Sequence, residues 1–283
     1  MKNYIKLFIV LLLFPLFVVA QEEKPKKEEK VKEKLERPAF ESSFIIDNPT
    51  NVLFSKNSLE IQMAHRFGLI TGGENDLAGI WAPSNIRIGA SYALHERLTI
   101  GGGVTKFDRL LDLNWKVALL RQTRSYKMPV SVSYYGNWVV DSRGKENFNL
   151  IQDRYSFFHT LIFARRFNEM ISLQVAPSWS HYNLVATTMR NDMIAISGGG
   201  RIKISPQTSI MFDYTQPITK FLKDNPRPGI SVGVEFATSS HAFQLLIGNY
   251  NGIIPQKNIM FNQNDYFKGD ALIGFNITRL YNF

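Results

Sequence analysis

The chain has 283 residues, a formal net charge of +9 at pH 7 and no cysteine. This length suits one large domain or two small ones. The lack of cysteine excludes a disulfide framework, an iron–sulfur cluster, a thiolate zinc site and anchoring through a lipidated cysteine. A basic excess can indicate a nucleic-acid partner, but here the charge is spread without a basic run and the chain begins with an export signal. We therefore expect no nucleic acid, and instead anionic lipid head groups or anionic solutes.

The first twenty residues have the pattern of a signal peptide. Lys2 and Lys6 give a positive start, residues 7–19 form an apolar run, and Ala20 ends a stretch of small residues that suits cleavage. An uncleaved membrane anchor is the alternative, but thirteen apolar residues fall short of the roughly 20 that a spanning helix needs. We expect cleavage after Ala20. Without the two lysines, 31 basic and 24 acidic residues remain, a net charge of +7.

Two segments of different character follow the signal peptide. Residues 21–38 are almost entirely Glu, Lys and Pro, with seven basic and six acidic side chains. Such a sequence cannot bury apolar surface, so it predicts a disordered or loosely helical tether in the periplasm. Residues 39–57 contain scattered apolar side chains and are assigned as a periplasmic transition segment. They suit either a short periplasmic strand or packing into the mouth of the next domain.

From residue 58 to the end, apolar and polar residues alternate. The clearest stretch places Leu111, Leu113, Trp115, Val117 and Leu119 between Asp112, Asn114, Lys116 and Ala118. Period-two alternation is typical of strands with two different faces. Most segments approach the length of about 9–11 residues with which a tilted strand crosses a bilayer. The predicted strands are residues 58–68, 84–94, 97–106, 110–121, 128–139, 155–166, 170–181, 193–204, 207–215, 229–238, 240–249 and 269–283.

The connections between these segments alternate in length. They are short after the even-numbered strands and long after most odd-numbered ones, at residues 69–83, 140–154, 182–192, 216–228 and 250–268, with a short exception near 107–109. Outer-membrane barrels have an even strand count, short periplasmic turns and longer outside loops. The fold class predicted for residues 58–283 is thus all-β: a single closed antiparallel transmembrane β-barrel of about 12 strands. A soluble secreted β-sandwich would carry more charge at the apolar positions.

The last predicted strand contains a candidate signal for insertion into the outer membrane. Phe275, Ile277, Tyr281 and Phe283 share one parity, and the chain ends on the last of them. This resembles the C-terminal signal that barrel insertion machinery recognises in outer-membrane proteins. Arg279 departs from the apolar pattern, and near a membrane edge its charged group can reach water.

The opposite parity carries the charged residues, which predicts a polar lumen. Eleven side chains are candidates for its lining: Glu60, Arg66, Arg87, Asp112, Lys116, Arg166, Arg201, Lys203, Asp213, Glu235 and Asp270. Two interpretations remain open. The charges pair with one another and close a narrow barrel, which we favour, or they line a pore that selects solutes. A barrel of twelve strands lies between eight-stranded barrels filled by side chains and the water-filled porins of 16 or more.

Motifs for catalysis or cofactor binding are scarce. The five histidines lack the close spacing of a zinc site, so we expect no metal and no cofactor. Some outer-membrane barrels are hydrolases with a serine–histidine pair on the outer wall, and His159 and His181 lie near Ser178 and Ser180 on neighbouring predicted strands. No G-x-S-x-G motif accompanies them. We expect no enzymatic activity.

The order of several short motifs resembles a known family. They are HRFG at 65–68, LLRQ at 119–122, PVSVS at 129–133, residues 164–167, GGGRIKIS at 198–205, HAFQL at 241–245, and GFNI at 274–277 followed by Arg279. Together they resemble the outer-membrane β-barrel family of Bacteroidetes-type bacteria catalogued as domain of unknown function 5777. The resemblance covers residues 55–283. It implies a barrel without an assigned activity, and no functional residues are transferred from it.

Two functions remain open for an outer-membrane barrel of this kind. The polar lumen and basic excess favour a narrow channel for small polar or anionic solutes. The balanced lumen charge, the tether and an apolar long loop favour a closed scaffold barrel in a multi-protein envelope complex. That loop contains Ile253, Ile254, Met260, Phe261, Tyr266 and Phe267, which is unusually apolar for an exposed segment.

Overall fold

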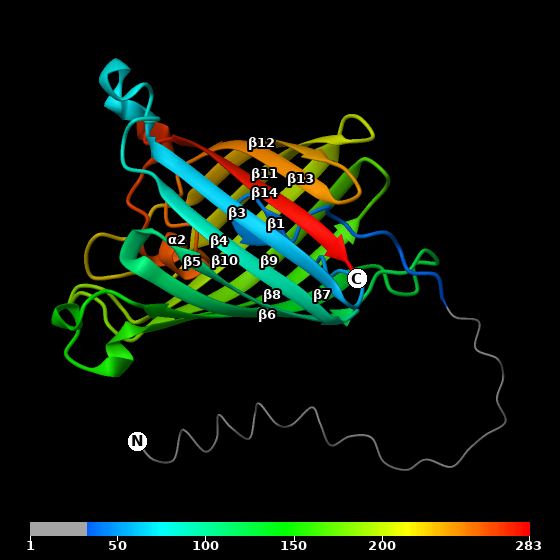
Figure 1. The fold of residues 1–283 in the computed structure, drawn as a ribbon, viewed down its shortest axis with the longest axis horizontal. Coiled ribbons are helices and arrows are strands. Elements are labelled where there is room, and N and C mark those ends of the chain that lie inside the picture. The colour runs from blue at the N-terminus through cyan, green and yellow to red at the C-terminus, as the bar shows by residue number, and fades with distance from the viewer. Residues whose placement is uncertain (1–32) are drawn as a thin grey trace, which may run out of the picture. The chain divides into compact units, whose positions relative to one another are not determined.

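The structure is a computed structural model that describes residues 33–283. The expected signal peptide and most of the tether lie outside these residues. Within them, twelve strands form one closed antiparallel barrel (Figure 1). The strands are β3 (Ser58–Leu69), β4 (Asn85–His95), β5 (Leu98–Thr105), β6 (Leu110–Leu120), β7 (Ser131–Asp141), β8 (Tyr155–Arg166), β9 (Ile171–Tyr182), β10 (Asp192–Lys203), β11 (Thr208–Pro217), β12 (Gly229–Ala237), β13 (His241–Gly248) and β14 (Leu272–Asn282). The predicted twelve-strand barrel is confirmed.

Each strand pairs with its neighbours in the sequence, and β14 pairs with β3 to close the ring. Closure leaves no sheet edge, so every strand has two partners for its backbone N–H and C=O groups. This is the condition under which a sheet can cross a bilayer. No helix within residues 33–283 is long and apolar enough to span a membrane.

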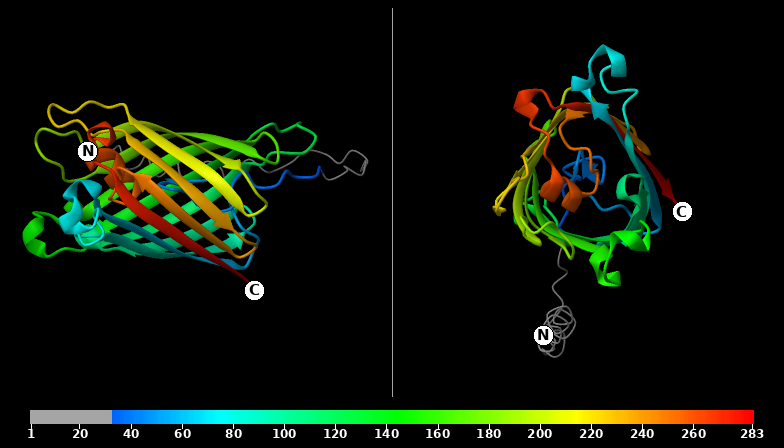
Figure 2. Two further views of the ribbon diagram at one scale, coloured as in Figure 1. Left: turned by 90° about the horizontal axis from the view of Figure 1, so that it is seen from above. Right: turned by 90° about the vertical axis from the view of Figure 1, so that its left-hand side faces the viewer.

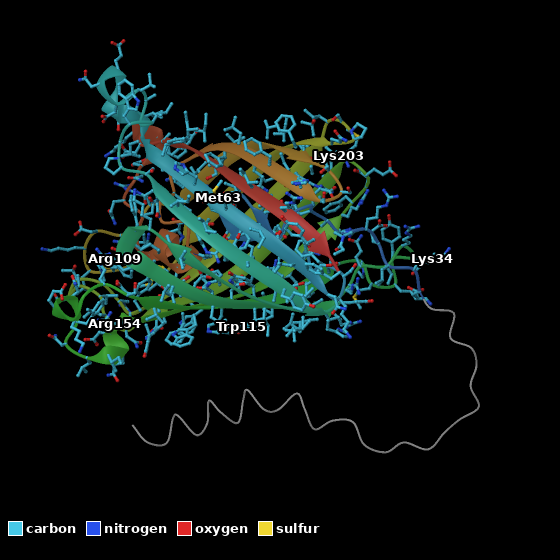
Figure 3. All side chains as sticks on the ribbon, viewed as in Figure 1. Lys34, Met63, Arg109, Trp115, Arg154 and Lys203 are labelled. Atoms are coloured by element: carbon cyan, nitrogen blue, oxygen red, sulfur yellow. The ribbon has the colours of Figure 1, made fainter. Side chains whose placement is uncertain are left out.

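The wall has an apolar outer face and a polar inner face. Leu113, Val175 and Leu245 are among the apolar side chains exposed on the outside, and Trp115 also points away from the barrel (Figure 3). Buried Ser, Thr, Asn, Gln and charged residues occupy the alternate positions. The period-two pattern of the sequence therefore becomes an apolar belt around a polar lumen.

The two ends of the barrel differ. At the turn end, short connections join the strands, β3 begins and β14 ends; at the loop end lie the long connections (Figure 1). These contain short 3₁₀ helices at Ile70–Gly72, Glu74–Asp76, Lys145–Asn147, Ile151–Arg154 and Tyr266–Lys268, and the α-helix α2 (Pro255–Phe261). A further 3₁₀ turn, Phe107–Arg109, forms the one short connection at this end.

Two segments of the chain fill the lumen, as the view along the barrel axis shows (Figure 2, right). Residues 39–57, here called the plug, enter from the turn end and contain the paired strands β1 (Phe44–Ile45) and β2 (Asn48–Pro49). Residues 249–262, here called the insert, fold in from the loop end and carry α2. Of the two arrangements that the sequence left open for 39–57, the structure has the segment packed inside the barrel.

Apolar contacts hold both segments to the wall. Phe40 and Ile45 of the plug belong to a buried cluster with Met211 and Leu246 of the wall, here called the plug cluster. Ile259 and Met260 of the insert lie in a second cluster, with a set of wall residues that are Tyr135, Phe158, Ile162, Ala176, Met193 and Ala195. Phe44 of the plug packs against this second cluster, so the plug and the insert share packing in the lumen.

The membrane belt predicts a depth-dependent cost for a charge on the outer face. Val175 lies near the middle of β9 and is 52% exposed, whereas Ile171 begins the same strand on the same face. We expect Val175→Arg to lower the free energy of unfolding in vesicles by about 2–4 kcal/mol and the control Ile171→Arg by about 1 kcal/mol or less. Denaturant titration, read as the fraction of heat-modifiable barrel, measures both; equal costs would contradict a bilayer around β9.

Candidate functional site

The centre of the lumen is built around an ion pair between the plug and the wall. Arg66 of β3 donates to Asp47, which lies at the tip of the plug hairpin, with an N–O distance of 2.9 Å. The two side chains are only 1% and 3% exposed. Arg66 also donates to the side-chain oxygen of Asn276 and to the carbonyl of Ile46. A buried guanidinium is thus satisfied mostly by groups that the plug and β14 supply.

The turn of the plug hairpin is strained and held by the wall. Ile46 has a φ of 52°, a left-handed conformation that is unusual for a β-branched residue. Its carbonyl accepts hydrogen bonds from Asn276 and Arg66, and its side chain is buried in the plug cluster. The wall therefore fixes a backbone conformation that the isolated segment would avoid.

Three wall carboxylates are held mainly by neutral donors. Asp213 accepts the backbone N–H groups of Asp47 and Asn48, both at 3.1 Å, and the Asn48 side-chain amide at 2.8 Å. Glu235 accepts from Ser42 of the plug and from Gln244, and Glu60 accepts from Ser43 of the plug. These bonds place plug donors against acidic positions of the wall, which satisfies carboxylates that the lumen buries.

The wall itself provides a further charged pair. Arg87 donates to both oxygens of Asp112, at 2.8 Å each, and to Gln62. Asp112 also accepts from Asn114 and Asn137. A bidentate arginine–carboxylate pair with extra amide donors is well suited to burial. This pair is the mutual charge pairing that the sequence analysis favoured.

Lys116 connects the wall to the plug backbone. Its ammonium group donates to the carbonyl oxygens of Ser43 and Val52, at 3.0 and 3.1 Å. The side chain is buried and lies near the rings of Phe44 and Tyr135. A cation on the wall therefore holds both arms of the plug.

The structure brings together eight of the eleven predicted lumen residues. Glu60, Arg66, Arg87, Asp112, Lys116, Arg201, Asp213 and Glu235 are buried. Arg166 and Lys203 are half-buried at the turn end. Asp270 lies apart from them, because β14 begins only at Leu272 and the carboxylate of Asp270 accepts the backbone N–H of Asp265 in the preceding loop.

Sequence reasoning missed the partners of these charges. Asp47, Asn48 and Glu41 come from the plug, which was assigned to the periplasm, and Gln244 and Asn276 are uncharged wall residues. A signal was present in the sequence, since two apolar residues lead into Asp-Asn-Pro, a set of residues typical of turns. It predicts a tight turn but not what the turn packs against.

The apolar long loop has a different role from the one its composition suggested. Ile253, Ile254 and Met260 are buried inside the barrel, and Gln256 donates to the side chain of Asn137 on the wall. Phe267 is the exception, with 86% of its surface exposed. Most of the apolar character of this loop therefore serves the insert and is not available to a partner protein.

Cavities remain at both ends of the lumen, and the middle is closed. The cavity at the turn end measures about 460 Å³ and the one at the loop end about 360 Å³. Lys203 borders the first and Arg154 the second (Figure 3). A central cavity bordered by Asp47 of the plug and Ile254 of the insert measures only about 20 Å³, which is room for about one water. Within residues 33–283, the plug and the insert together fill the middle of the lumen.

Glu41 is the plug residue that borders the cavity at the turn end. It lies 2.8 Å from Arg201 and 3.8 Å from Lys203. Burial raises the pKa of Glu41, but the hydrogen bond from Arg201 and the charges of Arg201, Lys203 and Arg166 outweigh it, so this pKa lies below the ordinary 4.5. The carboxylate is therefore ionised at neutral pH and attaches the plug to two wall cations.

His159 and His181, the two histidines of the candidate hydrolase site, do not pair with Ser178 or Ser180. His159 bonds the hydroxyl of Tyr134 at 2.6 Å, and its ring is stacked on Trp179. Ser178 and Ser180 are buried on the inner face, so the barrel wall separates them from His159. Among the described residues, no three His, Asp or Glu side chains are grouped in a way that could hold a metal ion.

The predicted insertion signal runs along the outer face of β14 and ends at the turn end. Phe275 stacks against His65 and Phe243, and Arg279 lies over the ring of Tyr281 at 4.7 Å. Phe283 is 81% exposed at the end of the chain. Recognition of these residues by insertion machinery stays a prediction.

The ion pair between Arg66 and Asp47 leads to a prediction about how firmly the plug is held. Arg66→Met leaves the carboxylate of Asp47 buried without its cation, which costs about 3–5 kcal/mol for a buried pair. We expect the amides of Asp47 and Asn48 to exchange their hydrogen about two to three orders of magnitude faster. Hydrogen exchange read by mass spectrometry on a plug peptide measures this. Arg66→Met combined with Asp47→Leu should restore most of the protection; unchanged exchange in the single variant would contradict the pair.

The low pKa of Glu41 predicts a pH dependence. A depressed folded-state pKa contributes stability above pH 4.5, and this contribution disappears as the pH falls through the folded-state value. Because the carboxylate is 41% exposed, we expect a modest difference of about 0.2–1 kcal/mol between wild type and Glu41→Gln at neutral pH. Denaturant unfolding of both from pH 7 to pH 3 should show the difference shrinking to zero. A difference that stays constant with pH would rule out the ionic contribution.

Comparison with known proteins agrees with the barrel fold. Residues 40–281 match the family described as a membrane-bound beta barrel domain of unknown function, number 5777. No curated protein sequence matches the chain. The match therefore runs from the plug to the last strand.

Similar solved structures include porins and an outer membrane channel. The NanC porin is 6% identical, with 80% of this chain and 99% of that one covered and a TM-score of 0.49. The KdgM porin in complex with disordered oligogalacturonate is 8% identical, with 80% and 99% covered and a score of 0.47. An outer membrane channel from Pseudomonas putida F1 is 11% identical, with 81% and 97% covered and a score of 0.47. These scores are low, and it is the sequence match over residues 40–281 that identifies this chain as a member of the membrane-bound β-barrel family of domain of unknown function 5777.

Proposed function

We propose that this barrel is a gated outer-membrane channel for small polar or anionic solutes, closed by its own plug. The observation that carries the proposal is a lumen with a cavity at each end and a filled centre, in which polar groups as well as apolar contacts hold the plug to the wall. A plug made as a hairpin near the N-terminus can leave without breaking any pair in the wall ladder. The wall would keep all its strand pairs, and so remain a closed barrel in the lipid, while the lumen opened.

The charges at the turn end support an anionic solute. The residues that border its cavity include Arg37, Arg166 and Lys203, against the single carboxylate of Glu41. Such a mouth raises the local concentration of anions. By the usual asymmetry of these barrels, the turn end would face the periplasm and the long loops the outside, and the tether would then lie in the periplasm.

A closed scaffold barrel in an envelope complex is the second candidate. The filled centre of the lumen favours it, because plug, insert and wall share one continuous set of hydrogen bonds and apolar contacts. Such a barrel would present its loops and its tether to partner proteins and conduct nothing. The two candidates differ in whether the plug leaves the lumen.

A cysteine pair tests the channel directly, because the natural chain has no cysteine. The side chains of Asn48 on the plug and Ser197 on β10 are 3.2 Å apart. In planar bilayers, we expect the reduced variant Asn48→Cys/Ser197→Cys to open intermittently with anion selectivity. Oxidation should abolish the openings and reduction should restore them, since a disulfide fixes the plug to the wall.

The cysteine-free chain, treated with the same oxidant, is the control and should keep its openings. A KCl gradient gives the selectivity from the sign of the reversal potential. If the folded, heat-modifiable barrel stays silent in both redox states, and also in the plug-weakened variant Arg66→Met, the channel is contradicted and the scaffold stands.

A further inference from the structure

Basic side chains border the cavity at the turn end, and so does Glu41, which attaches the plug to the wall. Of the described residues that border it, Arg37, Arg166 and Lys203 are basic and Glu41 is the one acid. Arg166 donates through its Nε to the carbonyl of Asn168. With about 460 Å³, the cavity is in the size range of small-molecule sites.

Glu41 supplies the negative charge that lies among these basic side chains. Its carboxylate takes the hydrogen bond of Arg201 and lies 3.8 Å from the ammonium group of Lys203. Arg201 is only 2% exposed, and its Nε has no partner among the described residues. Glu41, in contrast, is 41% exposed and borders the cavity. A solute in the cavity can therefore reach the carboxylate that holds a buried cation.

We infer that the cavity binds small oxyanions of the phosphate class, and that a bound dianion displaces Glu41 from Lys203 and Arg201. A phosphate group offers several acceptor oxygens to guanidinium and ammonium groups. A solute with a single negative charge would only take the place of the Glu41 carboxylate and would bring no additional charge. A dianion can also attract Arg37 and Arg166, which border the cavity and form no ion pair within residues 33–283.

Displacement of Glu41 loosens the plug at its entrance. The carboxylate is two residues from Ala39 and next to Phe40, which are both buried in the plug cluster. Without its ionic attachment this part of the plug keeps its apolar contacts and the hydrogen bond from Ser42 to Glu235, so it is held less firmly and opens more often. The inference deepens the proposed function by naming the class of solute that opens the channel, yet binding and plug release can be measured without any conductance.

A single cysteine reports the state of the plug. Ala39→Cys introduces the only thiol of the chain at a position that is 3% exposed. The full-length variant in detergent is treated with a neutral maleimide while inorganic phosphate replaces chloride at constant ionic strength. We expect a saturable acceleration of labelling of about fivefold, the size of effect that loss of one partly exposed ion pair can produce.

Matched variants separate the site from general salt effects. In the Ala39→Cys background, Arg166→Gln should lose the phosphate response and Arg166→Lys should keep part of it. Arg279→Gln should respond as the parent does, because this arginine lies on the outer face over Tyr281. Glu41→Gln should label fast without phosphate and gain little from its addition.

The outcomes are distinguishable. Equal labelling in phosphate and chloride, or an unchanged response in Arg166→Gln, overturns the site. Phosphate binding seen by calorimetry without faster labelling overturns the displacement of Glu41. A phosphate response in a barrel that never conducts supports the site and counts against the channel.

Discussion

Every other feature of this protein depends on the need to pair backbone polar groups in a medium without water. A sheet that crosses a bilayer meets that need only by closing on itself. Closing twelve strands makes a ring too wide for its own inward side chains to fill and narrower than the water-filled porins. The chain fills the difference with two of its own segments, one from each end.

The filled lumen then decides how the charges of the wall are satisfied. Arg87 of β4 and Asp112 of β6 lie on either side of β5 and pair directly. Arg66, Asp213 and Glu235 instead meet donors and acceptors of the plug. A buried charge without a partner is costly, so each of these wall residues stabilises the plug inside the lumen. The same contacts are polar, and polar contacts can be exchanged for water or for a solute.

The hairpin tip of the plug and its entrance at the turn end are held by different groups. The hairpin tip lies deep in the lumen, where the carboxylate of Asp47 and the carbonyl of Ile46 are both bound by buried wall donors. The entrance is held by Glu41, a carboxylate that solvent reaches beside a basic cavity. If the plug is released as proposed, the entrance, which solvent reaches, would open before the buried tip.

The sequence by itself determined the wall. Alternation with period two, segments of membrane-crossing length and alternating connections are local patterns, so they predicted the twelve strands and the inward parity of residues such as Arg87 and Asp112 without knowledge of the fold. The predicted start of the last strand was three residues early, which wrongly placed Asp270 on the lumen wall.

Only the tertiary structure decided what the inward charges bind. Asn48 and Asp213 are 165 residues apart in the chain, and Ser42 and Glu235 are 193 apart. Such pairs exist because closure of the ring brings distant strands around one central segment. A local pattern records which way a side chain points, whereas the partner it meets across the lumen depends on how the whole ring closes.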